Sequence, residues 1–131
     1  MKKQHAFTLI ELMIVIVVLG IVSTIAVNTY RSHVIESNRT EARSALQLAA
    51  ATLEKCRSVF GRYDHADCGY ADFSTESNVY RVTANVAATA FTLTATPVAG
   101  SVQTGDTDCA ALTLTSIGIK DATGNEIDRC W

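Results

Sequence analysis

Residues 7–27, FTLIELMIVIVVLGIVSTIAV, form an apolar run of bilayer length that carries one full charge, Glu11, near its start. As a helix, such a run rises by about 31 Å, which matches the hydrocarbon core of a bilayer. An ionised carboxylate in hydrocarbon costs at least about 2.5 kcal/mol, so it is by default a functional group with a partner. The run contains no Lys, Arg or His. The partner must therefore be another chain, a chain terminus or the headgroup region; the plainest alternative is a single-pass anchor with one tolerated acid.

The remainder of the chain has the size of one domain. Of 131 residues, 48% are hydrophobic, and the apolar run inflates that share. Residues 28–131 must therefore build a modest core from about a hundred residues. With 11 Lys and Arg against 13 Asp and Glu, the chain is not strongly charged.

The six residues before the run, MKKQHA, are short and basic, as in the n-region of an export signal. A secretory signal would have a small-residue cleavage site after its apolar stretch, and the sequence after this run has no A-x-A-like site. We therefore expect the run to remain in the mature protein. Lys2 and Lys3 favour a cytoplasmic N-terminus, although Arg31, Arg39 and Arg43 weaken that argument.

A basic leader, a small residue and then FTLIELMIVIVVLGI resemble the class III signal and N-terminal helix of the type IV pilin family. The resemblance implies that a prepilin peptidase removes residues 1–6 by cutting between Ala6 and Phe7. It further implies that the new amino group of Phe7 is methylated, and that Glu11 is the glutamate through which pilins assemble.

This processing would supply the partner that Glu11 needs. A free α-amino group has a pKa of about 8, so at neutral pH it is cationic and can neutralise a carboxylate of a neighbouring subunit. Before cleavage the same nitrogen is held in an uncharged peptide bond. Leader removal would thus act as an electrostatic switch that favours the addition of subunits in one axial register.

The sequence departs from the pilin pattern at two positions. Most pilins have Gly before the cleavage site, where this chain has Ala6, which is larger by a methyl group. Pilins usually carry a helix-bending proline where this chain has Asn28, and Asn keeps its backbone N–H. The local unwinding that pilins associate with that proline and with Gly20 is therefore not expected from this sequence.

Beyond residue 27 the sequence indicates a long amphipathic helix. Apolar residues recur at three- and four-residue steps between residues 30 and 59, and charged residues such as Arg39 fall off that stripe. Neither Pro nor Gly interrupts residues 21–60, so we expect one continuous helix that ends at Gly61. The stripe consists of Val34, Ala42, Ala45, Leu46, Ala49, Leu53 and Cys56.

A sheet is expected to follow the helix. Residues 61–78 are polar with little periodicity and are typical of a loop. Three later segments alternate apolar with polar residues, as antiparallel strands do, and Gly118 and Gly124 frame a short fourth strand or a loop. The three segments are 79–87, 90–98 and 111–116.

This pattern predicts an α+β fold, with one long N-terminal α-helix packed on a three- or four-stranded antiparallel sheet. The resemblance implies that this is the type IV pilin fold, with the apolar half of the helix protruding. The division expected is a leader (1–6), a transmembrane and filament-core helix half (7–27) and a globular domain (28–131). Within that domain, residues 28–60 would be helix, 61–78 loop and 79–131 the sheet and a disulfide-closed C-terminal loop. The last residues, ending in Cys-Trp, also resemble the tail of short pilins.

Four cysteines follow the apolar run, and an even number in a small exported domain indicates two disulfides. Four cysteines allow three pairings. The layout of pilins implies that Cys56 pairs with Cys68 and that Cys109 pairs with Cys130. Each bond should stabilise the domain by about 3 kcal/mol.

Metal binding is a weaker alternative for part of this region. His65 and Cys68, with Asp64 and Asp67, contain candidate ligands, but zinc sites usually show two ligand pairs and disulfides consume thiols.

Asp106 and Asp108 faintly resemble the calcium loop of secretion pseudopilins. Calcium needs six or so oxygen ligands, so a solvated turn is favoured there. The sequence has no nucleophile motif and no phosphate-binding glycine loop, so we predict neither an enzyme nor a cofactor.

Lys55, Arg57, Arg62 and Arg81 are the candidates for a basic patch that binds DNA. Asp and Glu residues are interspersed among them, which favours an ordinary mixed surface. Binding of DNA or of a host surface is therefore left open.

The resemblance implies a structural subunit of a type IV pilus. It would sit in the bacterial inner membrane, with a cytoplasmic N-terminus, until an assembly platform moves it into an extracellular filament for adhesion, twitching motility or DNA uptake. Its partners would be membrane lipid, the prepilin peptidase and methylase, the assembly platform and other pilins. The alternatives are a low-abundance minor pilin or adhesive binding module, and a type II secretion pseudopilin.

Overall fold

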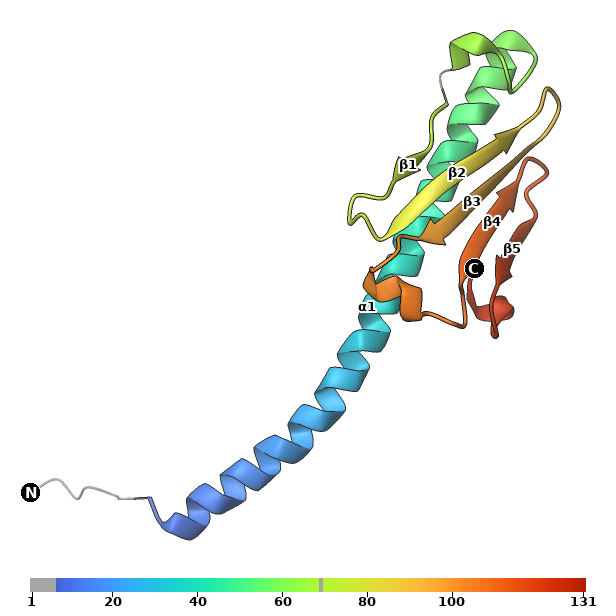
Figure 1. The fold of residues 1–131 in the computed structure, drawn as a ribbon. Coiled ribbons are helices and arrows are strands. Elements are labelled where there is room, and N and C mark those ends of the chain that lie inside the picture. The colour runs from blue at the N-terminus through green and yellow to red at the C-terminus, as the bar shows by residue number, and fades with distance from the viewer. Residues whose placement is uncertain (1–6, 69) are drawn as a thin grey trace, which may run out of the picture. The chain divides into compact units, whose positions relative to one another are not determined.

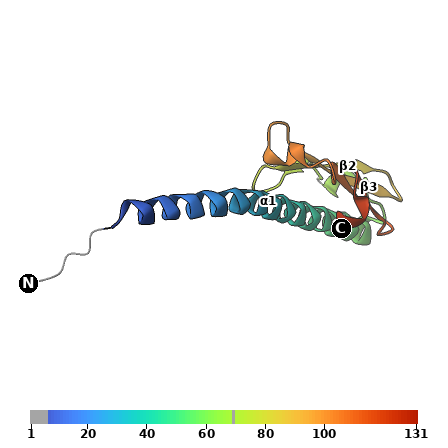
Figure 2. The same ribbon diagram turned by 90° about the horizontal axis from the view of Figure 1, so that it is seen from below.

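A computed structural model describes residues 7–68 and 70–131, and the chain divides after Val34 into two compact units. The long helix α1 (Leu9–Phe60) contributes to both units, and the strands all belong to the second (Figure 1). Within the second unit, α1 lies along one face of the sheet (Figure 2).

α1 has 52 residues and ends where the sequence predicts. The N–H of Gly61 donates to the carbonyl of Arg57 at 2.8 Å, and the φ of Gly61 is 75°. Glycine adopts this left-handed conformation more easily than other residues, and it commonly ends a helix. The predicted continuous helix is therefore confirmed.

In the second unit, one face of α1 is buried. Its buried residues are Arg39, Ala42, Leu46, Ala49, Leu53 and Cys56. Leu46 and Leu53 are at most 1% exposed, and burying each such side chain contributes about 1.5–3 kcal/mol. Ala45 is half-buried and packs against this core. The predicted apolar stripe is thus confirmed over its central turns.

The sheet has five antiparallel strands in the order β1-β2-β3-β4-β5. Their bounds are Phe73–Ser74 (β1), Tyr80–Val86 (β2), Phe91–Pro97 (β3), Ala111–Thr115 (β4) and Lys120–Thr123 (β5). Short 3₁₀ helices lie in the connections: η1 (Ala66–Cys68), η2 (Val102–Gly105) and η3 (Ile127–Arg129). Each strand pairs with the next one along the chain.

Alternate residues of the strands point into the core beneath α1. Val82 of β2 lies opposite Ala95 of β3, and Leu93 of β3 lies opposite Leu114 of β4. All four side chains are buried. Because successive side chains of a strand face opposite sides, this burial explains the alternation in the sequence.

The predicted α+β fold is confirmed, and the segment between Gly118 and Gly124 contains β5. The expectation of three or four strands missed β1, which lies within residues 61–78. β1 is only two residues long, too short to produce an alternating pattern.

The structure corrects the expectations for Arg39 and Asp106. The sequence places Arg39 off the buried stripe and Asp106 in a solvated turn, whereas both are buried, at 9% and 5% exposure. Arg39 Nε and Nη2 donate to Asp106 Oδ2 and Oδ1 at 2.7 and 2.6 Å. Gln103 Nε2 and the N–H of Cys109 also donate to this carboxylate, at 2.8 and 3.2 Å. This clamp joins α1 to η2 and to the segment that leads into β4.

The hydrogen bonds of the clamp determine its ionisation. Burial alone would raise the pKa of Asp106, but the bonds from Arg39 and from the Cys109 N–H outweigh burial, so the pKa of Asp106 is lowered. The bond to Asp106 raises the pKa of Arg39 in turn. Burial, and then the charge of Asp106, raise the pKa of the neighbouring Tyr80 to about 12. The clamp is therefore an ion pair at neutral pH.

Asp106→Ala should destabilise the chain by about 3–5 kcal/mol, because it leaves the guanidinium of Arg39 buried without a counter-charge. Denaturant unfolding at neutral pH measures this change. Since the pKa of Asp106 is lower in the folded chain, its contribution should be present above about pH 4 and be lost as the pH falls through the folded-state value. The double variant Arg39→Met/Asp106→Leu should lose less stability than Asp106→Ala. An Asp106→Ala chain as stable as wild type would contradict the clamp.

Gly124 follows β5 at a point where two stretches of backbone meet. Its φ is 143°, and a Cβ there would lie 2.1 Å from the carbonyl oxygen of Asp108. The N–H groups of Asn125 and Glu126 donate to the carbonyls of Thr107 and Asp108 at 3.1 and 3.2 Å. Only a residue without a Cβ permits this approach.

Gly124→Ala should therefore cost about 3 kcal/mol or more, through backbone clash and strain. Gly118→Ala is the matched control, because Gly118 has a φ of 80° but open space around its Cβ position. Its cost should be only about 1–2 kcal/mol. Thermal unfolding of both variants provides the comparison, and equal losses would show that close approach at Gly124 is unimportant.

Candidate functional site

The start of α1 is capped by Thr8. The N–H of Glu11 donates to Thr8 Oγ1 at 3.3 Å, and the N–H of Leu12 donates to the Thr8 carbonyl at 3.2 Å. Thr8 is thus the N-cap, and Thr-x-x-Glu is the spacing of a capping box. A carboxylate in the first turn also interacts favourably with the helix dipole. This local role of Glu11 was missed from the sequence, although the spacing was visible there.

The first half of α1 exposes an almost continuous apolar surface. Every residue from 7 to 27 is exposed in the isolated chain, and Phe7 is 85% exposed. Among the described residues, α1 is the helix whose length and composition would allow it to cross a membrane, with a mean hydropathy of 2.7 over its most apolar 18 residues. Such a surface is stable only against lipid or other apolar helices.

Hydroxyl groups on this surface are bonded within the helix. Ser23 Oγ donates to the Leu19 carbonyl, and Thr24 Oγ1 donates to the Ile21 carbonyl, both at 2.7 Å. Lipid and apolar helices offer no hydrogen-bond partner, so each hydroxyl must find one within its own helix. Unlike these hydroxyl groups, the carboxylate of Glu11 has no charged partner, because none of the ion pairs among residues 7–68 and 70–131 includes it.

Ala6 lies outside the described residues, and with it the expected cleavage site before Phe7. α1 continues without interruption through Gly20 and Asn28. The Asn28 carbonyl accepts a hydrogen bond from Ser32 Oγ at 3.2 Å. An asparagine retains the backbone N–H that a proline would remove, so helix continuity here has a simple cause.

Two disulfides constrain the second unit. The structure brings together Cys56 and Cys68, and Cys109 and Cys130, with Cα atoms 5.6 Å apart in each pair. The first bond ties the last turns of α1 to η1. We call this region, residues 54–68, the α1 tip.

Two aromatic rings stack on the α1 tip. The chain reverses at Gly61, and His65 then returns to lie parallel to Phe60, with ring centroids 4.1 Å apart and an interplanar angle of 4°. Phe60 is 40% exposed, and His65 Nδ1 lies 3.6 Å from Asp67 Oδ2. Sequence reasoning missed this stack, because two aromatic residues on either side of a turn give no periodic signal.

Charged side chains of the α1 tip bond to one another and to Tyr63. Arg57 Nη1 donates to the hydroxyl of Tyr63 at 2.9 Å, and that hydroxyl donates to Glu54 Oε1 at 2.6 Å. Arg62 binds Asp64 through two nitrogens, with 2.7 Å between Nη2 and Oδ2. The hydrogen bond from Arg62 lowers the pKa of Asp64.

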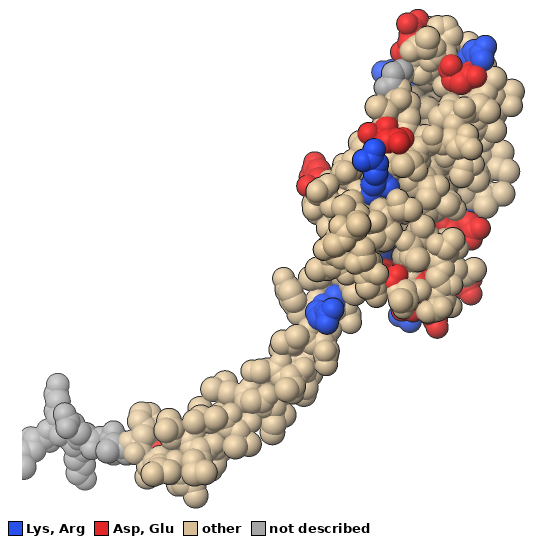
Figure 3. Space-filling view, in the orientation of Figure 1, with Lys and Arg blue, Asp and Glu red and all other residues tan. Residues whose placement is uncertain are grey.

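The four candidate basic residues do not form one patch. Lys55, Arg57 and Arg62 lie within eight residues on the α1 tip, whereas Arg81 is exposed on β2. Figure 3 shows Lys and Arg interspersed with Asp and Glu on the face in view. Residues 35–131 contain eight Lys or Arg and twelve Asp or Glu, so the second unit is acidic overall.

The residues considered as metal ligands have other partners. The sulfur of Cys68 is bonded to Cys56, Asp64 is paired with Arg62, and His65 stacks on Phe60. Within the described ranges, no three or more His, Cys, Asp or Glu side chains converge to hold a metal ion.

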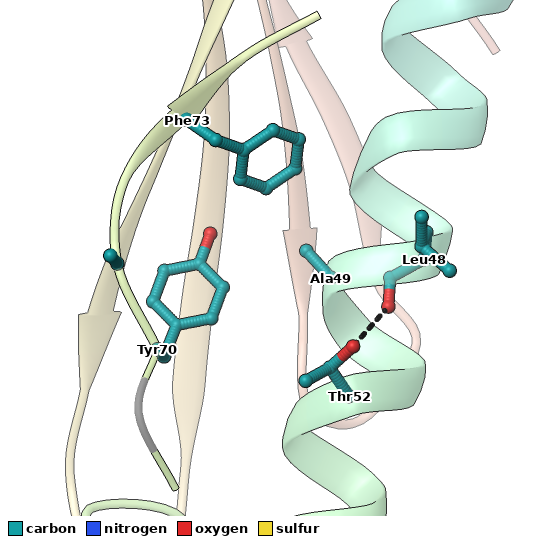
Figure 4. A pocket seen from close by; sticks show the side chains of 6 residues that line it. Leu48, Ala49, Thr52, Tyr70 and Phe73 are labelled. Atoms are coloured by element: carbon teal, nitrogen blue, oxygen red, sulfur yellow. Dashed lines mark hydrogen bonds between the residues drawn. The ribbon is translucent and has the colours of Figure 1, made fainter.

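An open groove runs between α1 and the segment that contains β1. One part is a cavity of about 310 Å³ whose walls include Leu48 of α1 and Tyr70 and Phe73 of the facing segment (Figure 4). A second cavity of about 440 Å³ shares Leu48 and Phe73. Leu48 is 68% exposed, and the buried hydroxyl of Tyr70 has no hydrogen-bond partner among the described residues. The groove is mainly apolar and contains no catalytic grouping.

Comparison with known proteins finds two family models that match this chain. Residues 28–113 match the family model described as "Type IV minor pilin ComP, DNA uptake sequence receptor", and residues 1–27 match the "Prokaryotic N-terminal methylation motif". Two relatives from Dichelobacter nodosus, each named "Probable minor fimbrial protein", are 39% and 38% identical over 56 residues. That alignment covers 43% of this chain and only 35% of each relative.

Proposed function

The chain belongs to the family of the type IV minor pilin ComP, DNA uptake sequence receptor, and we propose that it is a minor subunit of a type IV pilus. The family is one of pilus proteins rather than of enzymes. Its description and the names of the relatives favour the minor pilin, which the sequence alone left as an alternative. The single observation that carries the proposal is the exposed apolar half of α1 with one carboxylate in its first turn.

We propose that residues 7–27 exchange one apolar environment for another. Before assembly the helix lies in the inner membrane, and in the filament it packs among the corresponding helices of other pilins. Extraction is tolerable because apolar burial is exchanged rather than lost. The globular domain, residues 28–131, then faces the outside, where its two disulfides fit an oxidising compartment.

Leader removal prepares the chain for this exchange. Cleavage between Ala6 and Phe7, followed by methylation, creates a cationic amine one residue before the N-cap Thr8. Thr8 bonds the backbone N–H of Glu11, so the carboxylate itself is free to pair with the amine of a neighbouring pilin. That pairing removes an uncompensated charge from the helix bundle and determines the axial register.

Glu11→Ala should leave the chain in the inner membrane but reduce its incorporation into pili at least tenfold, because the amine of its neighbour loses its counter-charge. Immunoblots of membranes and of sheared pili measure the two pools. Thr8→Ala is the matched control, since it removes the cap and keeps the charge, and it should assemble nearly as wild type does. Wild-type amounts of Glu11→Ala in pili would refute this role.

The family's printed description also supports a second function, binding of DNA, and we propose the α1 tip as its site. Lys55, Arg57 and Arg62 are exposed there. Arg57 donates to the hydroxyl of Tyr63 and is in none of the ion pairs of the described residues, so its charge remains available. The pair of Arg62 with Asp64 is exposed, and such pairs contribute little, so Arg62 can exchange it for a phosphate.

Labelled DNA titrated with the full chain in detergent micelles tests this function by fluorescence anisotropy. The triple variant Lys55→Gln/Arg57→Gln/Arg62→Gln should bind at least tenfold more weakly at low salt, whereas the control Arg81→Gln should change little. With at most three phosphate contacts, the slope of log affinity against log salt should be no steeper than about −3. Equal losses in the triple variant and in Arg81→Gln would place the site elsewhere.

A further inference from the structure

The Phe60–His65 stack is a partly exposed aromatic surface on the α1 tip, which also carries Lys55, Arg57 and Arg62. Phe60 is 40% exposed and its neighbour Val59 is 65% exposed. Both residues, together with Lys55, line a cavity of about 270 Å³ beside the stack. Phe60 and Val59 therefore offer apolar surface to this small volume, and Lys55 and Asp67, which also lines it, add a cation and a carboxylate.

Two features attach the segment that carries His65 to the end of α1. Gly61 turns the chain back on α1, and the Cys56–Cys68 disulfide fixes the returning segment. Since the disulfide already attaches that segment to the helix, exposed rings are not needed for the attachment. Aromatic side chains that are rigid and exposed bind planar partners at a low entropic cost.

The charge of the second unit limits how DNA can be held. Acidic residues outnumber basic ones by twelve to eight in residues 35–131, and the basic residues gather most closely at the α1 tip. Proteins that bind DNA mainly through phosphates need a positively charged surface that follows the backbone. The second unit has no excess of positive charge, so contacts to the bases must contribute a larger share of the affinity.

We propose that Phe60 and His65 form a stacking platform for an unpaired base, and this proposal rests on the DNA binding proposed above. The chain should therefore prefer single-stranded DNA to closed duplex. A base that continues the stack would lie beside Lys55, which can contact an adjacent phosphate. Stacking of a base on an aromatic side chain is independent of sequence, because every base has a π-face. In a closed duplex the bases are stacked on one another and cannot use the platform.

Anisotropy titrations with the full chain in detergent micelles test the platform. The probes are a labelled oligothymidylate and a blunt duplex of the same length. The oligothymidylate should bind more tightly, and Phe60→Ala should weaken it roughly tenfold while leaving duplex binding unchanged. His65→Ala should weaken it as well, and His65→Phe, which keeps a ring, should restore binding. Val102→Ala is the matched control, because Val102 is an exposed apolar residue on η2, outside the α1 tip, and the variant should behave like wild type.

The possible results distinguish a failure of the stacking platform from a failure of DNA binding as a whole. Wild-type affinity of Phe60→Ala and His65→Ala for oligothymidylate would show that the stack only packs the chain, while DNA binding by Lys55, Arg57 and Arg62 would stand. Tighter binding of the duplex than of the single strand would also overturn the platform. If neither DNA binds the wild-type chain, both proposals fail. Thiol titration, which should find the Cys56–Cys68 bond intact in each variant, confirms that a loss is not due to misfolding.

Discussion

The carboxylate of Glu11 lies in the first turn of an otherwise apolar helix half, and the proposed assembly depends on its charge. An apolar helix half without a charge could remain in lipid indefinitely, whereas one with an acid gains stability wherever a cation is supplied. Thr8 bonds the backbone at Glu11 and not its carboxylate, so helix formation does not use up the charge. A chain terminus created by cleavage is a cation that appears only after processing, and it would therefore couple maturation to assembly.

The second unit meets a different requirement, which is to keep a small domain folded in the extracellular location proposed above. Its core is one face of α1 against a five-stranded sheet, and such a core is modest for its length. The Arg39–Asp106 clamp and two disulfides add ties at three separate places, namely η2, the α1 tip and the β4–β5 region. The same ties make the α1 tip rigid, and rigidity is what a binding surface there would require.

Much of this fold could be predicted because its signals are periodic. The stripe on α1 and the alternation in β2 and β3 extend over enough residues to be recognised, and Gly61 marks a clear end. β1 was missed because two residues carry no period. The burial of Arg39 was missed because its partner, Asp106, lies 67 residues away and no local pattern joins them. The capping of Glu11 by Thr8 was visible in the spacing, whereas the Phe60–His65 stack depends on the turn at Gly61 and on the Cys56–Cys68 bond.

We infer that leader cleavage creates the cation that Glu11 requires. The intact mass of this chain in sheared pili tests it most directly, because the mass reports both the position of the new N-terminus and its modification. The account predicts the mass of residues 7–131 with one added methyl group and two disulfides. A chain that still begins at Met1 within assembled filaments would contradict the account, since its nitrogen at Phe7 would be an uncharged amide.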